Sequence, residues 1–279
     1  MGPPDSLPSL PRAHADVSSG RRALGSHVGA LSLLAGWEGP LNLDCRAHGA
    51  DTITDVLGFR EMRRAADPQP PQLPADLERR EIRALEHDAT YAEVDLANLA
   101  LTDQHANGVT FQTAKLTGVE LAGSRLEHLG ITDTQLTGCD LANLQSPRAS
   151  ATRAAISTSR LTGIALPEAV LRDVAIRGCR VDLASFGFTR LARVTFEDCL
   201  LVQTDFLEAQ LESVRFHRCD LTRSDFRGAK LEHCEFRRSD LTDVQGVDSL
   251  RGAAMEWPDI IGMAGVWAAA LGIEVLDQD

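Results

Sequence analysis

The sequence predicts an all-β fold in which the chain winds as a four-sided parallel β-helix with short helical caps. Two observations lead to this prediction. From Tyr91 to Leu241 one register of every fifth position is almost wholly apolar, and a series of small residues lies two positions before it. A period of five matches neither the 3.6-residue period of an α-helix nor the two-residue period of a flat strand. Self-similarity at a fixed period is typical of repeat architectures.

The two series define the inside of the predicted coil. The main series has 31 positions, of which 28 carry a large apolar side chain, with Ala106, Ser146 and Ala151 as the exceptions. The second series runs from position 94 to 244, and 26 of its 31 residues are Ala, Ser, Thr, Cys or Val. We expect five residues to form one side of a square coil and four sides to form a turn, because both series then point inward. The remaining positions face solvent, and most charged residues of this region lie there.

Several stretches resemble the Ala-(Asp/Asn)-Leu-X-X units of the pentapeptide-repeat family. They include Cys139-Asp-Leu-Ala-Asn-Leu144 and Cys219-Asp-Leu-Thr-Arg-Ser-Asp-Phe226, and the resemblance covers residues 91–245. It implies a right-handed quadrilateral parallel β-helix, the pentapeptide-repeat solenoid. Some family members bind bacterial DNA gyrase and related topoisomerases as dimeric acidic rods that imitate duplex DNA, and some protect the enzyme from quinolones or toxins. Arg160 and Arg180 depart from the Asp or Asn of the pattern.

The residues before the repeats divide into two parts. Residues 1–74 are rich in proline near both ends and are predicted to be a low-complexity, disordered segment. Residues 75–90 are predicted to be a helical cap, because strong helix formers dominate 75–87 and Leu77, Ile82 and Leu85 share one helical face. Such a cap would cover the unpaired backbone groups of the first coil.

Residues 246–279 are predicted to be a C-terminal helical cap or dimerisation segment. This stretch is too apolar for a solvated helix, so it either covers the last coil or pairs with a second copy to form a homodimer. The residues of the candidate dimer interface are Trp257, Ile260, Ile261, Val266 and Trp267.

The composition narrows the classes of partner and compartment. With 28 basic and 40 acidic residues the net charge is −12, which argues against direct binding of nucleic acid. No apolar run approaches the ~20 residues needed to cross a bilayer, and the best candidate, residues 27–37, is short and interrupted. The six cysteines show no clustered spacing, which is typical of a reducing compartment, and we expect a cytoplasmic location.

Four cysteines offer the most prominent candidate chemistry. They lie in the small series at separations that are multiples of 20 and should stack on one side of the coil; they are Cys139, Cys179, Cys199 and Cys219. A straight ladder of thiols cannot supply the tetrahedral shell that zinc requires, so packing as small buried residues is the favoured interpretation. The histidines are scattered, and there is no nucleophile motif or Gly-rich phosphate loop. We therefore expect no catalytic residues, metal or cofactor, and no enzymatic activity.

Exposed apolar residues are the clearest indication of a binding surface. Five of them occupy outward slots within two coils and form a candidate protein-binding patch: Leu183, Phe188, Leu200, Val202 and Leu207. The patch either binds a partner or is covered by the N-terminal segment. The sequence favours a non-enzymatic protein-binding scaffold. The alternative, a DNA-mimicking modulator or protector of DNA gyrase or a related topoisomerase, is weakened because residues 91–245, with 21 acidic and 17 basic residues, are nearly neutral.

Overall fold

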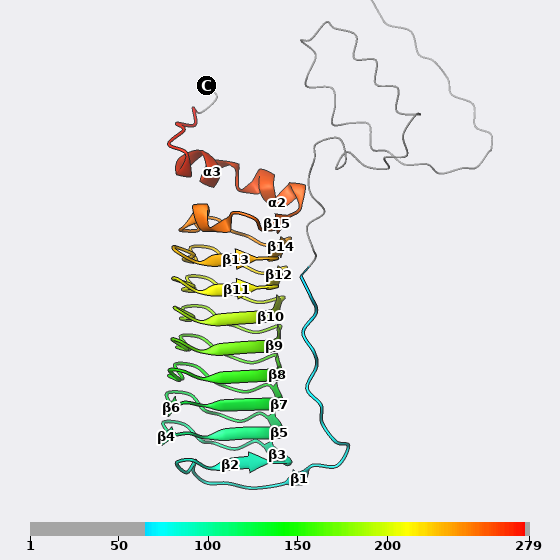
Figure 1. The fold of residues 1–279 in the computed structure, drawn as a ribbon. Helices are drawn as coiled ribbons and strands as arrows, with labels where there is room; N and C mark the ends of the chain where they lie inside the picture. Colours follow the sequence, from blue (N-terminus) through cyan, green and yellow to red (C-terminus); the bar gives the residue numbers. More distant parts are fainter. Residues whose placement is uncertain (1–64, 277–279) are drawn as a thin grey trace, which may run out of the picture. The chain divides into compact units, whose positions relative to one another are not determined.

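The computed structural model describes residues 65–276 of the 279-residue chain. Over residues 91–245 the chain winds as a four-sided parallel β-helix, with a cap at each end and an extended N-terminal segment along its side (Figure 1). The fold predicted from the five-residue period is therefore confirmed. The disorder predicted for residues 1–64 lies outside the described residues.

One turn of the β-helix takes 20 residues, as the sequence predicts. The ladders join each residue to its counterpart 20 positions later, so Phe111 pairs with Ile131, Ile131 with Ala151, and Ala151 with Leu171. All of these ladders are parallel. The backbone groups of each coil are thus satisfied by the coils above and below it, and the interior is left to side chains.

Two sides of each coil form regular strands, and the other two are joined mainly by isolated bridges. The longest strands span eight residues and bend across one corner; they are β5 (Thr110–Thr117), β7 (Gly130–Thr137), β8 (Ser150–Ser157), β9 (Val170–Arg177) and β10 (Arg190–Glu197). The shorter strands are β1 (Glu78–Arg79), β2 (Thr90–Ala92), β3 (Val94–Ala97), β4 (His105–Asn107), β6 (Arg125–Glu127), β11 (Gln210–Glu212), β12 (Arg215–His217), β13 (Lys230–Glu232), β14 (Glu235–Arg237) and β15 (Ala254–Met255).

The core of the C-terminal half consists of two ladders of phenylalanines. Phe186, Phe206 and Phe226 stack from coil to coil on one side, with ring centroids 5.4 and 4.8 Å apart. A second ladder on the opposite side, Phe196, Phe216 and Phe236, stacks at 5.2 and 4.9 Å. Rings of the two ladders meet edge to face at the centre, which is a favourable aromatic geometry.

The N-terminal cap is not the predicted helix. Residues 75–89 wind as an irregular coil under the first turn, with one short strand, β1, which pairs with β3, and Thr90 begins β2. The N–H of Arg80 donates to the carbonyl of Asp95 at 3.1 Å, and the N–H of Asp88 donates to the carbonyl of Asn107 at 2.8 Å. A helix would satisfy its own backbone and leave these edge carbonyls unpaired, so completion of the ladder outweighs local helix propensity. Leu85 is nevertheless buried in the core, on the face that the helical pattern assigned to it.

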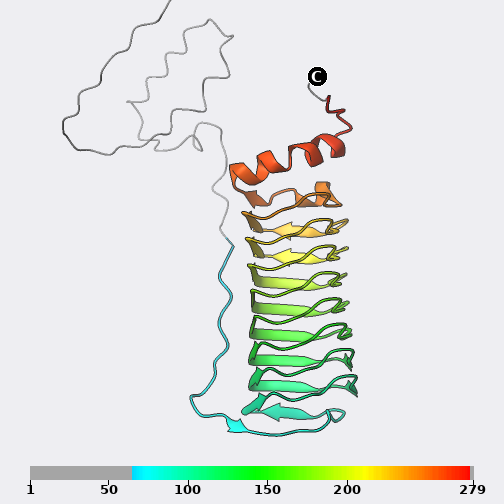
Figure 2. The ribbon, with the colours of Figure 1, turned by 180° about the vertical axis from the view of Figure 1, so that it is seen from behind.

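The C-terminal cap continues the ladder before it turns helical. A short 3₁₀ helix, η1 (Val247–Leu250), leads into β15, which pairs with β14. Two short helices follow, α2 (Trp257–Gly262) and α3 (Ala264–Ala270), and they lie across the end of the β-helix (Figures 1 and 2). Between residues 65 and 276, none of the helices is long and apolar enough to span a bilayer.

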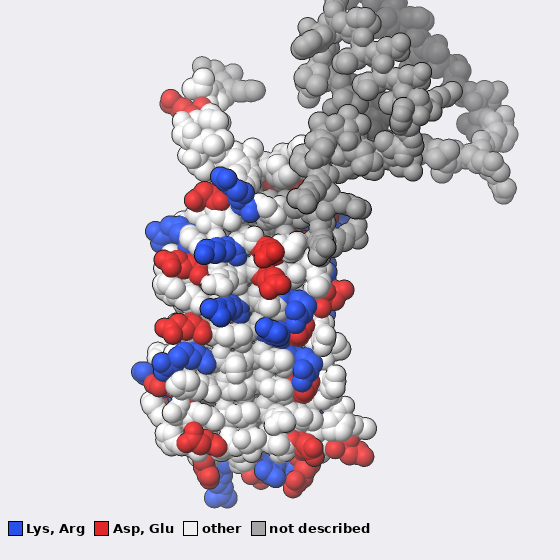
Figure 3. Space-filling view, in the orientation of Figure 1, with Lys and Arg blue, Asp and Glu red and all other residues white. Residues whose placement is uncertain are grey.

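The surface of the β-helix carries interspersed charges of both signs. Figure 3 shows lysines and arginines next to aspartates and glutamates over the face that it draws. Many of these charges pair between successive coils, as Arg177 does with Glu197 at 2.9 Å and Arg218 with Asp198 at 2.6 Å. Because such exposed pairs contribute little stability, the core and the ladders hold the fold together.

Candidate functional site

The predicted protein-binding patch lies around two consecutive corners of one coil. Leu183 and Phe188 occupy these corners with positive φ angles of 57° and 58°. Their exposed fractions are 56% and 53%, so both side chains project into solvent. We call Leu183, Phe188, Leu200, Val202 and Leu207 together the corner patch.

The corner positions make the identity of these two residues unusual. Among the described residues, 25 non-glycine residues have a positive φ, and all except Leu183 and Phe188 are polar or charged. Left-handed backbone conformations favour glycine or asparagine, because a larger side chain crowds the following carbonyl. Gly163 holds the corner of Leu183 one coil earlier, and Gly228 holds that of Phe188 two coils later. Neither backbone geometry nor solvation therefore accounts for a leucine and a phenylalanine here.

The rest of the corner patch lies on the next coil. The N–H of Leu183 donates to the carbonyl of Val202, and the N–H of Phe188 donates to that of Leu207, both at 2.9 Å. Val202 and Leu207 are half-buried, whereas Leu200 is 46% exposed. The structure thus brings the five residues onto two successive coils. Leu183 and Val202 meet at one corner, and Phe188 and Leu207 meet at the next.

A polar strip separates the two groups of the corner patch. Ser185 Oγ donates to Asp205 Oδ2 at 3.1 Å, and the N–H of Leu207 donates to Asp205 Oδ1 at 2.7 Å. These bonds fix the Asp205 carboxylate between the corners. Apolar anchors beside fixed hydrogen-bonding groups are the composition of a protein-binding surface.

The described part of the N-terminal segment does not cover this patch. Residues 65–74 contact the corner column that contains Asp133 and Asp173, which lies half a coil from the corner of Leu183 and one side of the coil from that of Phe188. The described part of the N-terminal segment therefore leaves the corner patch exposed, whereas coverage by residues 1–64 lies outside the described residues.

The four cysteines of the column are buried and free of disulfides. Cys179 Sγ donates to the carbonyl of Arg177 at 3.3 Å, and Ser159 in the same column makes the equivalent bond to Ser157 at 2.8 Å. Burial raises the pKa of the Cys179 thiol to about 11, so the nucleophilic thiolate is scarce near neutral pH. Nor does any group of three or more His, Cys, Asp or Glu side chains between residues 65 and 276 have the arrangement of a metal site.

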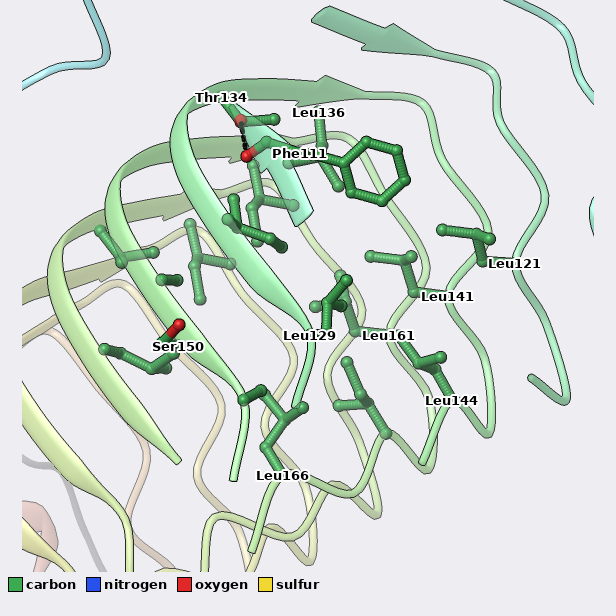
Figure 4. Close-up of a pocket in the computed structure, with 18 of the residues that line it drawn as sticks. Phe111, Leu121, Leu129, Thr134, Leu136, Leu141, Leu144, Ser150, Leu161 and Leu166 are labelled. Atoms are coloured by element: carbon green, nitrogen blue, oxygen red, sulfur yellow. Dashed lines mark hydrogen bonds between the residues drawn. The ribbon is translucent and has the colours of Figure 1, made fainter. Parts of the chain in front are cut away.

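A small apolar cavity lies inside the β-helix. It measures about 60 Å³, and Figure 4 shows leucines of successive coils, such as Leu136 and Leu161, pointing into it. It adjoins Ala151, one of the three exceptions to the large apolar series. At its edge Thr134 Oγ1 donates to the carbonyl of Phe111 at 3.3 Å, and the described residues that line the cavity carry no titratable group. It is a packing defect and offers no reactive chemistry.

The five candidate dimer residues divide between two faces of the C-terminal cap. Val266 and Trp267 pack against the core, with Met263 buried between the two helices. Trp257 and Ile261 point away from the core, with exposed fractions of 74% and 69%, and Ile260 is 37% exposed. The segment therefore caps the last coil with one face and leaves the other apolar face open.

The sequence of the β-helix matches a known family. Residues 177–245 match the family model described as Pentapeptide repeat region. These residues are a pentapeptide-repeat region. The 20-residue pairing register extends this repeat region toward the N-terminus, to residue 90.

Solved structures of pentapeptide-repeat proteins are similar at low sequence identity. HetL, a protein involved in heterocyst differentiation regulation from the cyanobacterium Nostoc sp., is 18% identical over 61% of this chain and 90% of its own, with a TM-score of 0.28. Full-length QnrB1, a plasmid-mediated fluoroquinolone resistance protein, is 18% identical over 66% of this chain and 100% of its own, also with a TM-score of 0.28. None of the curated proteins matches the chain.

One feature of the pentapeptide-repeat surface was not predicted from the sequence. Aspartate and arginine alternate at every twentieth position from Asp133 to Arg193, and the neighbouring outward positions Ala155 and Ala175 are small. In the structure this column borders the groove that holds residues 65–74. The alternation of aspartate and arginine in this column can be read from the sequence once the 20-residue turn is known.

Proposed function

We propose that this protein is a non-enzymatic scaffold that binds a protein partner through the corner patch. The observation that carries the proposal is the pair Leu183 and Phe188, the only apolar side chains among the described non-glycine residues of positive φ. A partner that buries both side chains would remove apolar area from water at the centre of a polar rim, which is the anatomy of a binding hot spot.

The charge pattern favours this proposal over imitation of DNA. A DNA mimic needs continuous acidic rows in place of phosphates. The outward column through Glu120, Asp140, Arg160, Arg180 and Leu200 is bridged from coil to coil, yet it changes sign along its length. Arg160 also pairs with Asp140 at 3.5 Å, which neutralises part of the row. Modulation of DNA gyrase or a related topoisomerase remains the alternative that the experiment distinguishes.

The test replaces the two corner anchors without straining the backbone. Asparagine is native to the Leu183 corner at Asn143, with a φ of 56°, so Leu183→Asn and Phe188→Asn should fold normally. The matched control is Gln203→Asn with Glu208→Asn, which changes the same two corners one coil further along. Partners captured by the wild-type chain should be lost with the first pair of changes and kept with the control.

Two outcomes would count against the proposal. Retention of every captured protein by the Leu183→Asn, Phe188→Asn chain would remove the corner patch as the binding site. Inhibition of gyrase supercoiling, or protection of gyrase from a quinolone, to the same degree by both variants would instead support the topoisomerase alternative.

We further propose that the open apolar face of the C-terminal cap joins two copies into a homodimer. The support for this is the exposure of Trp257 and Ile261 together with Leu271 and Leu276, which are 76% and 82% exposed. Several large apolar side chains exposed on one short segment are typical of an interaction site.

A further inference from the structure

Residues 65–74 form an extended segment that runs along the side of the β-helix (Figures 1 and 2). Three of its backbone N–H groups donate to carboxylates of the β-helix. Gln72 donates to Asp133 at 3.0 Å, Gln69 donates to Asp173 at 3.1 Å, and Ala65 donates to Glu235 at 3.1 Å. We call residues 65–74 the strap.

The strap lies over outward positions that are small. Ala175 and Thr195 occupy outward slots next to the Asp133–Arg193 column, yet they are only 8% and 7% exposed. Pro68 and Pro71, three residues apart on the strap, are half-buried. The strap therefore lies on a band of the β-helix that we call the groove, in which the small residues Ala155, Ala175 and Thr195 form the floor and the column of alternating Asp and Arg forms the wall.

Arginines of the β-helix itself hold the carboxylates of the wall in place. Arg153 binds Asp133 with two nitrogens, at 2.6 and 2.5 Å, and Arg193 binds Asp173 with two nitrogens, both at 2.7 Å. These bidentate pairs fix the planes of the carboxylates. Each carboxylate then has acceptor capacity left for one backbone N–H, so the acceptors are preorganised.

The spacing of these acceptors fits one backbone conformation. Asp133 and Asp173 are two coils apart, roughly 9.6 Å at the ~4.8 Å spacing of β-strands. Gln69 and Gln72 are three residues apart, which in a polyproline II helix is one turn of roughly 9.3 Å. One turn of polyproline II therefore advances by about two coils and returns an N–H to the same side of the segment.

The sequence of the strap is suited to this conformation. Prolines at 68, 70, 71 and 74 fix their own φ angles and hold the residues before them in extended conformations. Proline lacks an N–H, and the two donors that meet the column, Gln69 and Gln72, are not prolines. The segment thus combines stiffness with donors at the two positions where the wall accepts them.

We propose that this groove is a recognition site for polyproline II segments, occupied here by the strap and able to take a proline-rich segment of another polypeptide. The ligand carries free backbone N–H groups three residues apart, one for each carboxylate of the wall, with prolines between them. This site is distinct from the corner patch and does not depend on it. In the intact chain the tethered strap outcompetes a separate peptide, because tethering gives it a high effective concentration.

The test therefore weakens the strap in the full chain and supplies a ligand from outside. Gln69→Pro with Gln72→Pro keeps the extended conformation and removes both donors. Gln69→Ala with Gln72→Ala is the matched control that keeps them. Hydrogen exchange of residues 65–67 and 73–77 should be faster in the proline variant than in the alanine variant. Equal exchange in the two variants would overturn the proposal that the N–H groups of residues 69 and 72 hold the strap on the wall carboxylates.

The ligand is a fluorescein-labelled peptide with the sequence of residues 65–77, followed by fluorescence anisotropy. It should bind the proline variant saturably. A peptide with proline at both donor positions should bind at least ~10-fold more weakly, because two hydrogen bonds to ionised acceptors are lost. The wild-type chain should bind neither peptide. Absence of binding to the proline variant, or equal binding of the two peptides, would refute the proposal.

A change in the groove wall completes the test. In the proline variant, Asp133→Asn with Asp173→Asn should weaken peptide binding by at least ~10-fold. The control is Asp198→Asn, which removes another arginine-paired corner aspartate that the strap does not contact. Circular dichroism confirms that each variant is folded. An equal loss of binding in the control would show that the wall carboxylates have no specific role.

Discussion

At the residue scale, the stacked phenylalanines account for much of the stability of the core. The Phe216 side chain is fully buried between Phe196 and Phe236, with centroids 5.2 and 4.9 Å away. We expect Phe216→Ala to destabilise the protein by ~3–5 kcal/mol, because it leaves a cavity and breaks the ladder. Arg218→Ala, two residues away on the surface, is the control and should leave the denaturation midpoint almost unchanged. Equal effects in urea denaturation would contradict the inward register.

A second prediction at this scale concerns the internal cavity. Ala151 lies beside it, at a position where the neighbouring coils carry Ile131 and Leu171. Ala151→Leu should raise stability by ~1 kcal/mol, because it fills apolar space of about 60 Å³. Ala154→Leu is the matched contrast, since Ala154 belongs to the small series and has no such space; it should destabilise the protein by ~1–3 kcal/mol through overpacking. Thermal unfolding of both variants would show whether the two changes differ in sign.

At the element scale, the sequence predicted which residues point inward better than it predicted backbone conformation outside the repeats. The assignment of Leu85 to the core was correct, whereas the helix over 75–87 was wrong. The reason is that helix propensity is local, while the free edge of the first coil offers hydrogen bonds that depend on residues 15 to 20 positions away. The strap was missed for a related reason, because its contacts reach from Gln69 to Asp173 and leave no local signal.

The strap also leads to a prediction for pH dependence. Arg193 holds the pKa of Asp173 below its ordinary value of 3.8, and the N–H of Gln69 adds to this effect. A carboxyl whose folded-state pKa is lowered stabilises the fold above its unfolded-state pKa, and this stabilisation is lost as the pH falls through the folded-state value. The contribution of Asp173 should therefore be constant above about pH 5 and disappear in stronger acid.

The comparison of wild type with Asp173→Asn measures this contribution. Near neutral pH the variant should be less stable by ~1–3 kcal/mol, because a buried carboxylate with charged and backbone partners is lost. The difference in unfolding free energy should shrink as the pH is lowered below about 4, because the wild-type carboxyl is then protonated. A difference that stayed constant down to strong acid would show that ionisation of Asp173 does not contribute.

At the scale of the whole molecule, the fold could be predicted because one period governs most of the chain. Each coil contacts mainly its neighbours, so a register read from residues such as Leu96 and Leu116 fixes the position of all the others. The corner patch could be predicted in the same way, since an outward slot is outward on every coil. The positive φ at its corners also leaves a signal in the period, because glycines such as Gly163 and Gly228 recur in the slot that Leu183 and Phe188 occupy. The hydrogen bonds of Asp205 between the two corners could not be predicted, because they depend on side-chain conformation.

The oligomeric state provides the last prediction at this scale. Trp257 and Ile261 face away from the core, so Trp257→Glu with Ile261→Glu should leave the cap folded and convert a dimer into a monomer. The electrostatic control is Arg223→Glu, an exposed corner residue whose substitution alters the net charge by the same two units. Trp267→Ala should instead lower thermal stability, because Trp267 packs on the last coil. Sedimentation should give the mass of two chains for the wild type and for Arg223→Glu. It should give the mass of one chain for the Trp257→Glu, Ile261→Glu variant. A wild-type mass of one chain would refute the dimer.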